Sequence, residues 1–330
     1  MPIDRSDRKS DPATALRAAT IVLQAAGVLI VLGALPYEVF QLERFVIPKE
    51  LVLEAAALAA TLLCLSSARR LTLFMVDALL IAFLIASALS TLLASNGWLA
   101  FRAFGVSLAG AALFWCARTL ARAGWGKPIL IALAAAVVLG AVTALAQAYG
   151  LVTPNLASLT RAPGGTFGNR NFMAHLVTIG LPLLLLVSVE ARSRGGFALG
   201  AVGVALAAGA LVLSRSRAAW LGAGAAGLFL AVEGLWVGRL WTDAGVRHRV
   251  LQIAGVAVAG LALAVIIPNR LNWRSDSPYL DSLTGVANYK EGSGLGRMIQ
   301  YGNSLEMAAD DPVLGVGPGK IGRASCRERV

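Results

Sequence analysis

The sequence predicts an all-α polytopic membrane protein with about nine transmembrane helices, followed by the start of a large loop on the outer side of the membrane. The chain is 57% hydrophobic and only 14% charged, with a mean hydropathy of +0.72. A soluble domain is closer to half apolar and a quarter charged. The apolar residues also fall into blocks of about 18–22 residues with almost no charge, long enough to cross a ~30 Å hydrocarbon core as helices.

The blocks predict nine transmembrane helices within a membrane domain at 18–268. We expect them at residues 18–35, 51–67, 73–94, 103–121, 128–149, 171–189, 196–213, 218–236 and 250–268. The polar segment 1–17 precedes the first block. That block lacks a small-residue cleavage site, so we interpret it as a membrane span rather than a cleaved signal peptide.

The basic residues of the loops predict the orientation. Alternate loops carry 14 basic residues and the opposite loops carry 7. Since cytoplasmic loops are enriched in Lys and Arg, residues 1–17 are expected in the cytoplasm. The stretch Arg161–Asn171 and everything after Pro268 are then expected on the outer face. The 14 are Arg5, Arg8, Lys9, Arg17, Arg69, Arg70, Arg118, Arg122, Lys127, Arg192, Arg194, Arg239, Arg247 and Arg249; the 7 are Arg44, Lys49, Arg102, Arg161, Arg170, Arg215 and Arg217.

The net charge of +11 does not indicate a nucleic-acid-binding protein, because the basic residues lie in short loops between apolar blocks rather than on one face. Cys64 and Cys116 stand inside apolar blocks and are interpreted as small packing residues. The third cysteine, Cys326, lies in the last ten residues. The sequence therefore predicts no disulfide framework, no metal site and no cofactor.

A polar, glycine-rich stretch, "RAPGGTFGNRNFMAHL" (Arg161–Leu176), stands in front of the sixth apolar block. Gly164 and Gly165 form a turn leading into a helix, and Asn169 or Asn171 is expected to cap that helix. Free backbone N–H groups and the positive end of a helix dipole favour a bound anion.

A second cationic stretch, "LSRSRAAW", follows the seventh block and contains Arg215 and Arg217. Arginine presents a planar fork of donors that suits phosphate oxygens. The two stretches together predict a pocket for a lipid phosphate or polyprenyl diphosphate between the sixth and eighth helices. Plainer interpretations stay open: the glycines serve only a close turn, Arg170 anchors to headgroups, and "LSRSRAAW" is an ordinary short loop with Trp220 at the membrane interface.

Three further polar residues stand at or inside apolar blocks. His175 is interpreted as a polar residue facing neighbouring helices, with a functional role as the alternative. Asp77 and Gln147 are expected to face the bundle interior. Because Asp77 is nearly alone among carboxylates at membrane depth, the sequence speaks against a proton-coupled pump.

Beyond Pro268 the chain turns polar, and residues 269–320 are interpreted as the start of the large outer loop. Periodicity from about Gly296 to Ala309 predicts one amphipathic helix lying against the membrane or over a cavity. The loop's carboxylates include candidate general bases, but their spacing singles out none. They are Asp276, Asp281, Glu291, Glu306, Asp310 and Asp311.

The last ten residues, "IGRASCRERV" (321–330), resemble the translation of a common sequencing adapter. We interpret them as read-through after a truncation near Gly319 or Lys320. A genuine basic C-terminus is the alternative.

Several stretches, in order, resemble the O-antigen ligase / O-antigen polymerase-related superfamily of bacterial membrane glycosyltransferases. "GGTFGNRNFMAHL" is similar to its G-T-F-x-N-P-N-x-x-A segment, with Arg170 in place of the usual proline. "LSRSRAAWLG" is similar to its S-R-[GA]-[AS]-W segment. "GRMIQYGNSLEMAADDPVLGVGPGK" resembles the segment that opens the large loop. The ligase-related region is expected at about 171–320.

The resemblance implies an incomplete GT-C-type ligase fold in the bacterial inner membrane. It also implies an inverting, metal-independent glycan transfer from undecaprenyl diphosphate, as in lipopolysaccharide biosynthesis. The acceptor would be a lipid A-core sugar, a protein or another glycan. By position, Arg217 is the first candidate for binding the diphosphate, Arg161 the second, and Arg215 and Arg297 further candidates.

The family's key histidine follows the G-x-G-x-G segment, beyond Lys320, so this fragment is expected to be inactive. A transporter of a small anion or bicarbonate-like solute is the alternative function, because some relatives carry such a description.

Overall fold

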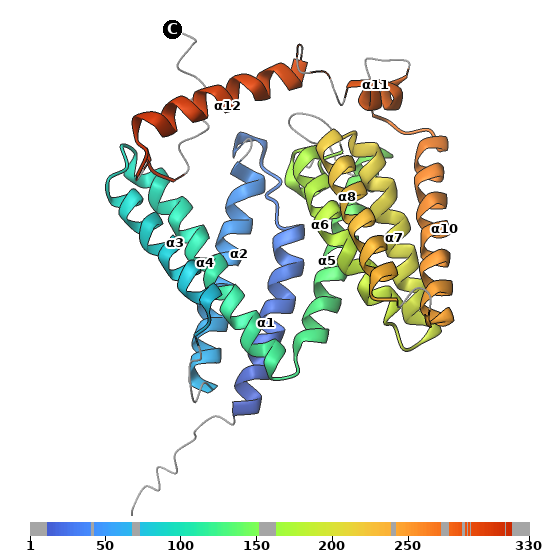
Figure 1. Ribbon diagram of the computed structural model, residues 1–330, viewed down its shortest axis with the longest axis horizontal. Coiled ribbons are helices and arrows are strands. Elements are labelled where there is room, and N and C mark those ends of the chain that lie inside the picture. Colours follow the sequence, from blue (N-terminus) through green and yellow to red (C-terminus); the bar gives the residue numbers. More distant parts are fainter. Residues whose placement is uncertain are drawn as a thin grey trace, which may run out of the picture. The chain divides into compact units, whose positions relative to one another are not determined.

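A computed structural model describes residues 12–40, 43–67, 73–151, 163–238, 242–271, 277–285, 288, 290, 292–313 and 315–318. The described residues form helices and connecting turns without strands (Figure 1). Within them, nine helices are long and apolar enough to cross a membrane, which confirms the predicted polytopic membrane fold. They are α1 (Pro12–Leu32), α2 (Glu43–Ser67), α3 (Met75–Leu92), α4 (Gly97–Arg122), α5 (Gly126–Ala148), α6 (Arg170–Val189), α7 (Arg194–Ser214), α8 (Arg217–Trp236) and α10 (Ala244–Ile266).

Shorter elements complete the described chain. Two single 3-10 turns, η1 (Glu38–Phe40) and η3 (Gly165–Phe167), precede α2 and α6. After α10 come the short helix α11 (Pro278–Thr284) and the helix α12 (Gly292–Asp310). The last of these includes the stretch 296–309 that periodicity predicts as an amphipathic helix. Residues 319–330, which include the predicted read-through segment, lie outside the described part.

Several helices begin earlier than hydropathy predicts, because polar caps set their ends. The Asn96 side chain accepts a hydrogen bond from Leu99 N (3.2 Å), so α4 begins at Gly97 rather than 103. Asp243 likewise caps α10 through Gly245 N (2.9 Å) and Val246 N (3.0 Å), six residues before the predicted start at 250. A helix therefore extends from its capping residue, which lies before the apolar block that identifies the membrane span.

The first turns of α2 contain Pro48, which the apolar pattern left outside a helix. Proline has no N–H, so the carbonyl of Arg44 loses its intrahelical donor. Leu35 N donates to that carbonyl instead (2.9 Å). The replacement bond joins the α1–α2 connection to α2 and allows the helix to begin at Glu43.

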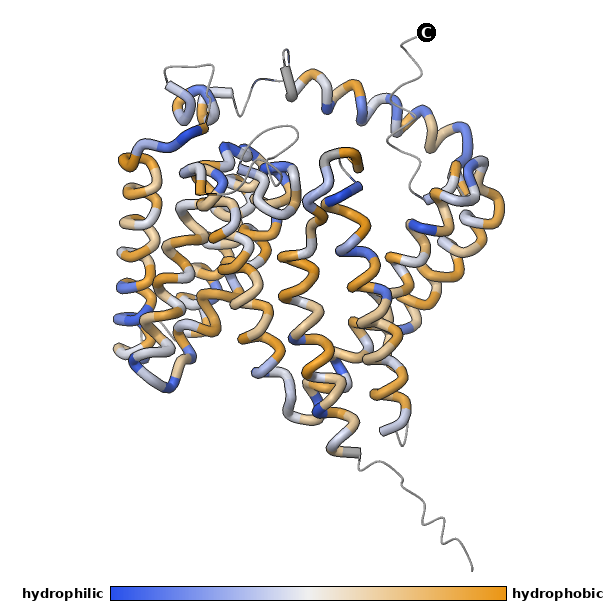
Figure 2. Tube along the Cα trace, turned by 180° about the vertical axis from the view of Figure 1, so that it is seen from behind, coloured by the Kyte–Doolittle hydropathy of each residue, from blue (hydrophilic) through white to orange (hydrophobic). Residues whose placement is uncertain are grey.

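The chain divides into two compact units. Unit 1 comprises Met1–Leu23, Leu53–Gly126 and Ala287–Val330, and unit 2 comprises Gln24–Val52 and Lys127–Val286. The helices α3, α4 and α12 therefore belong to unit 1, and α5–α8, α10 and α11 to unit 2. Along the tubes of Figure 2, apolar residues occupy the helix middles and hydrophilic residues gather toward helix ends.

Unit 2 is packed through small residues. Its core combines α5, α6, α7 and α10 and includes Ala141, Ala144, Ala207 and Ala210, each at most 1% exposed. At Gly260, an added Cβ would stand 2.5 Å from the carbonyl oxygen of Ala205, so the α10 and α7 backbones touch. Lipid tails give no hydrophobic drive for helix association, and small residues that allow close backbone approach take its place.

Candidate functional site

The connection between α7 and α8 is a tight corner, here called the arginine corner (Ser214–Arg217). Arg215 adopts the left-handed conformation (φ 50°, ψ 29°), the single non-glycine residue with positive φ among those described. Such a backbone costs roughly 1–3 kcal/mol and persists only where its surroundings hold it. Ser214 and Ser216 are buried, and the Ser214 hydroxyl donates to Leu211 O (2.6 Å).

Trp220 holds the other side of the corner. Its indole Nε1 donates to Leu211 O (3.0 Å), so the first turn of α8 is bonded to the last turn of α7. Thr178 on α6 donates to the Ala219 carbonyl (3.1 Å), and the three helices meet below the corner. The backbone of the corner is thereby fixed, and Arg215 and Arg217 start from rigid positions.

Both arginines contact the short segment that follows α10. Arg215 Nε donates to Ser282 Oγ (2.8 Å), and Arg217 Nη1 donates to the carbonyl of Gly285. Ser282 is buried and donates in turn to Pro278 O (2.8 Å), which fixes the direction of its hydroxyl. Figure 1 shows α11 at the same end of unit 2 as the α7–α8 connection.

Two tyrosines anchor α11 beside the corner. Tyr149 and Tyr279 pack on the small cluster of Ala148, Leu213 and Ala264, and the Tyr149 hydroxyl donates to Ala264 O (3.2 Å). Burial raises the pKa of Tyr279, against the opposing effects of an Asn269 hydrogen bond and the positive charge of Arg215. Burial and the neighbouring Tyr279 raise the pKa of Tyr149. Both phenols therefore stay neutral at ordinary pH.

The glycine-rich stretch forms a turn, here called the glycine turn (Pro163–Asn169), that is bonded into unit 2. Gly164 N and Gly165 N both donate to the side-chain oxygen of Gln147, at 2.6 and 3.0 Å. Thr166 donates to Val31 O. The N–H groups that sequence predicts for an anion thus donate to a protein side chain.

Conformation and packing account for Gly168, the third glycine of this turn. Gly168 has φ 65°, and a Cβ there would stand 2.3 Å from the ring of Phe45. Asn169 is the N-cap of α6, with its side chain accepting from Asn171 N (2.9 Å). Of the two asparagines proposed as caps, Asn169 has that role, and Asn171 is the second residue of the helix.

Lys49 on α2 brings a further cation to the glycine turn. Its Nζ donates to Gly33 O (2.5 Å) and lies 4.4 Å from the centre of the Phe167 ring. The sequence counted Lys49 among the loop charges and assigned it no role. A cation stacked on an aromatic residue of the turn is a contact that only the folded chain reveals.

The structure brings together two of the four predicted arginines, Arg215 and Arg217. Arg161 lies outside the described residues. Arg297 is exposed on α12 and belongs to unit 1. His175 is exposed on α6, so the interpretation that it faces neighbouring helices is wrong.

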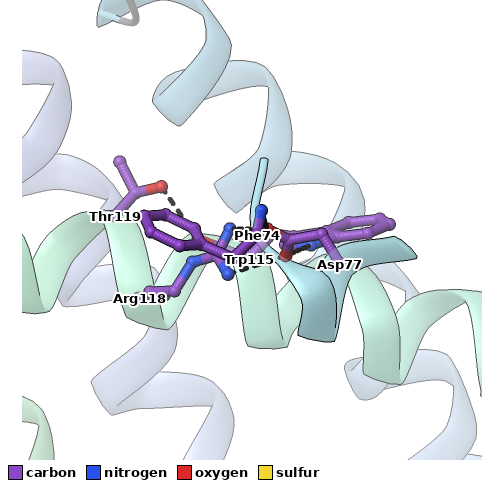
Figure 3. Close-up of polar contacts among 5 residues, drawn as sticks. All are labelled: Phe74, Asp77, Trp115, Arg118 and Thr119. Carbon is purple, nitrogen blue, oxygen red and sulfur yellow. Dashed lines mark hydrogen bonds and ion pairs between the residues drawn. The ribbon is translucent and has the colours of Figure 1, made fainter. Parts of the chain in front are cut away.

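Unit 1 contains a separate polar cluster around Asp77, the third residue of α3 (Figure 3). The carboxylate accepts from Phe74 N (2.7 Å), Trp115 Nε1 (2.8 Å) and Arg118 Nη2 (2.9 Å), and pairs with Arg118 Nη1 at 2.6 Å. Asp77 is inaccessible to solvent, as expected from sequence. Its contacts join the start of α3 to the end of α4.

Comparison with protein families gives one match in the C-terminal part. Residues 202–329, less than half of the chain, match the family model described as O-antigen ligase. The arginine corner, α11 and Arg297 fall inside this range, and the glycine turn precedes it. No curated protein and no solved structure matches. The match agrees with the resemblance carried by the motifs after residue 202: residues 202–329 of this polytopic membrane protein are similar to the O-antigen ligase family.

Proposed function

We propose that the protein transfers an oligo- or polysaccharide from undecaprenyl diphosphate to an acceptor at the outer face of the bacterial inner membrane. The observation that carries this proposal is the arginine corner: the O-antigen ligase-related region holds Arg215 and Arg217 on one rigid turn. A lipid A-core sugar, a protein or another glycan would serve as acceptor.

Cations at the arginine corner suit the chemistry of such a transfer. An acceptor hydroxyl attacks the anomeric carbon of the first sugar, and the bond from that carbon to the diphosphate oxygen breaks. The acceptor proton passes to a base, and undecaprenyl diphosphate leaves with inversion at the sugar. Negative charge grows on the leaving diphosphate, and fixed guanidinium groups stabilise it without a metal ion.

The positive-inside bias supports the outer-face location. The loops on the side of the arginine corner carry fewer basic residues than the opposite loops. Because cytoplasmic loops are enriched in basic residues, this asymmetry supports our proposal that the corner faces the outer side of the membrane.

The Asp77 cluster speaks against the transporter alternative. A carboxylate that carries an ion must exchange its partners, whereas Asp77 receives hydrogen bonds from a backbone N–H, an indole and a guanidinium. In the described part of the chain it acts as a structural ion pair between α3 and α4.

The test is binding of undecaprenyl diphosphate to the full chain in lipid nanodiscs. Arg217→Ala should weaken binding about 100-fold, and Arg217→Lys should recover part of it, because lysine keeps the charge but loses the planar fork. Arg192→Ala is the matched control: it also removes one arginine charge, but Arg192 follows the C-terminal end of α6. This variant should bind undecaprenyl diphosphate like the wild type. Equal affinities for Arg217→Ala and Arg192→Ala would refute the assignment.

A further inference from the structure

Arg217 and Gly285 are in unusually close contact. An ideal Cβ built on Gly285 would lie 2.5 Å from Nη2, 2.6 Å from Cζ and 2.8 Å from Nη1 of Arg217. The guanidinium therefore lies directly against the α-carbon of Gly285, while Nη1 donates to the Gly285 carbonyl. Any side chain larger than hydrogen would occupy the place of the guanidinium.

The backbone at Gly285 does not itself require glycine. Its φ of −74° and ψ of −3° lie in the right-handed region open to every residue. Its N–H donates to carbonyls of α11, so the C-terminal end of that helix is regular. What glycine provides here is space for Arg217.

The partner that Gly285 offers to Arg217 is a neutral carbonyl. Among the residues the structure describes, that carbonyl is the one polar partner of the Arg217 side chain, and none of their carboxylates lies within 4.0 Å of it. A guanidinium has five N–H donors in a fixed fork, so one hydrogen bond to a neutral carbonyl orients the group, and no carboxylate of the described residues neutralises its charge. Orientation without neutralisation is what an anion-binding arginine needs.

We propose that Gly285 is a positioning residue for Arg217: it sets the guanidinium in place for the diphosphate through its carbonyl and its missing side chain. The inference rests on the proposed function. Ser282 has the corresponding role for Arg215, since its buried hydroxyl accepts from Arg215 Nε while donating to Pro278 O.

Gly285→Ala separates positioning from folding. The added methyl group meets the end of a flexible side chain, which can swing away, and the backbone already has a conformation that alanine prefers. The variant should fold with wild-type thermal midpoint while its Arg217 guanidinium moves by roughly 1 Å, from 2.5 Å to ordinary contact. Gly224→Ala on α8, where an added Cβ meets nothing within 4 Å, is the matched control.

The experiment measures binding of farnesyl diphosphate, a short polyprenyl diphosphate, to the purified full chain in detergent. Gly285→Ala should weaken binding about tenfold and Gly224→Ala should leave it unchanged. In an Arg217→Ala background, Gly285→Ala should cause no further loss, because the two changes act on the same group.

The outcomes separate the two proposals. If Arg217→Ala abolishes binding but Gly285→Ala binds like Gly224→Ala, the positioning role is wrong and the proposed function stands. The positioning role is also wrong if Gly285→Ala weakens binding equally with and without Arg217. If Arg217→Ala itself binds farnesyl diphosphate like wild type, the proposed function fails.

Discussion

Substitution of Gly260 by alanine tests how much the close contact between the α7 and α10 backbones contributes to stability. The added Cβ would stand 2.5, 2.7 and 2.8 Å from the carbonyl oxygen, Cα and carbonyl carbon of Ala205. All three are backbone atoms, so no rotamer change relieves the clash. Ordinary contact begins at 3.4 Å, so α10 must move away from α7 by roughly 0.9 Å.

The expected loss of stability follows from that displacement. Overpacking typically costs about 1–3 kcal/mol, and a backbone clash belongs at the upper end. The gain in helix propensity from glycine to alanine offsets about 1 kcal/mol. We therefore expect Gly260→Ala to lower the free energy of unfolding by about 2 kcal/mol.

Gly255→Ala is the matched control, because Gly255 lies on the same helix and an added Cβ there meets nothing within 4 Å. It should be neutral or stabilising by up to about 1 kcal/mol. Unfolding in mixed micelles with increasing SDS, followed by circular dichroism, gives both values. Equal unfolding free energies for the two variants would refute the account of the α7–α10 contact.

Three more predictions follow from other contacts. Asp77→Asn should lower the SDS concentration at the unfolding midpoint, because Arg118 loses its carboxylate partner. Replacing both Asp77 and Arg118 with leucine should restore most of the lost stability. A double variant as unstable as Asp77→Asn would contradict this account of the ion pair. Because the pKa of Tyr279 is raised in the folded protein, the unfolded chain loses this phenol proton at a lower pH. The free energy of unfolding should therefore fall as the pH rises above about 10, and fall less steeply in Tyr279→Phe. Identical pH slopes for the two proteins would exclude the effect. Gln147→Leu should speed amide hydrogen exchange across the glycine turn, as mass spectrometry would show; unchanged exchange would mean that Gln147 does not hold the turn.

The membrane-spanning part of the fold could be predicted from the sequence because hydrocarbon imposes a length and a polarity on each helix. Helix ends were less predictable, since they depend on single capping residues such as Asn96 and Asp243. Pro48 is a sharper case. Its place inside α2 depends on Leu35 N, a donor from the preceding connection that no periodicity indicates.

Within the candidate site, the sequence identified Arg215 and Arg217 but not what holds them. Ser282 and Gly285 stand more than 65 residues further along the chain and belong to no motif of their own. Gln147 was recognised as a polar residue facing inward, but its partners are backbone N–H groups of a distant turn. Such contacts arise from tertiary packing, and local patterns contain no record of them.

The two halves of the predicted anion pocket differ in what their donors do. In the glycine turn, the N–H groups of Gly164 and Gly165 both donate to Gln147, and Gly168 is explained by its contact with Phe45. These contacts account for the glycines without any ligand. The arginine corner is therefore the half of the predicted pocket that supports anion binding.

In the arginine corner, the donors of Arg217 are not all used by protein partners among the described residues. A positive-φ residue and a Trp220 bond fix the backbone, and a glycine carbonyl orients Arg217 while its positive charge stays uncompensated among the described residues. A carboxylate partner would neutralise the guanidinium, whereas a neutral carbonyl only orients it. Among the described residues, the arginine corner therefore supports the proposed diphosphate site better than the glycine turn does.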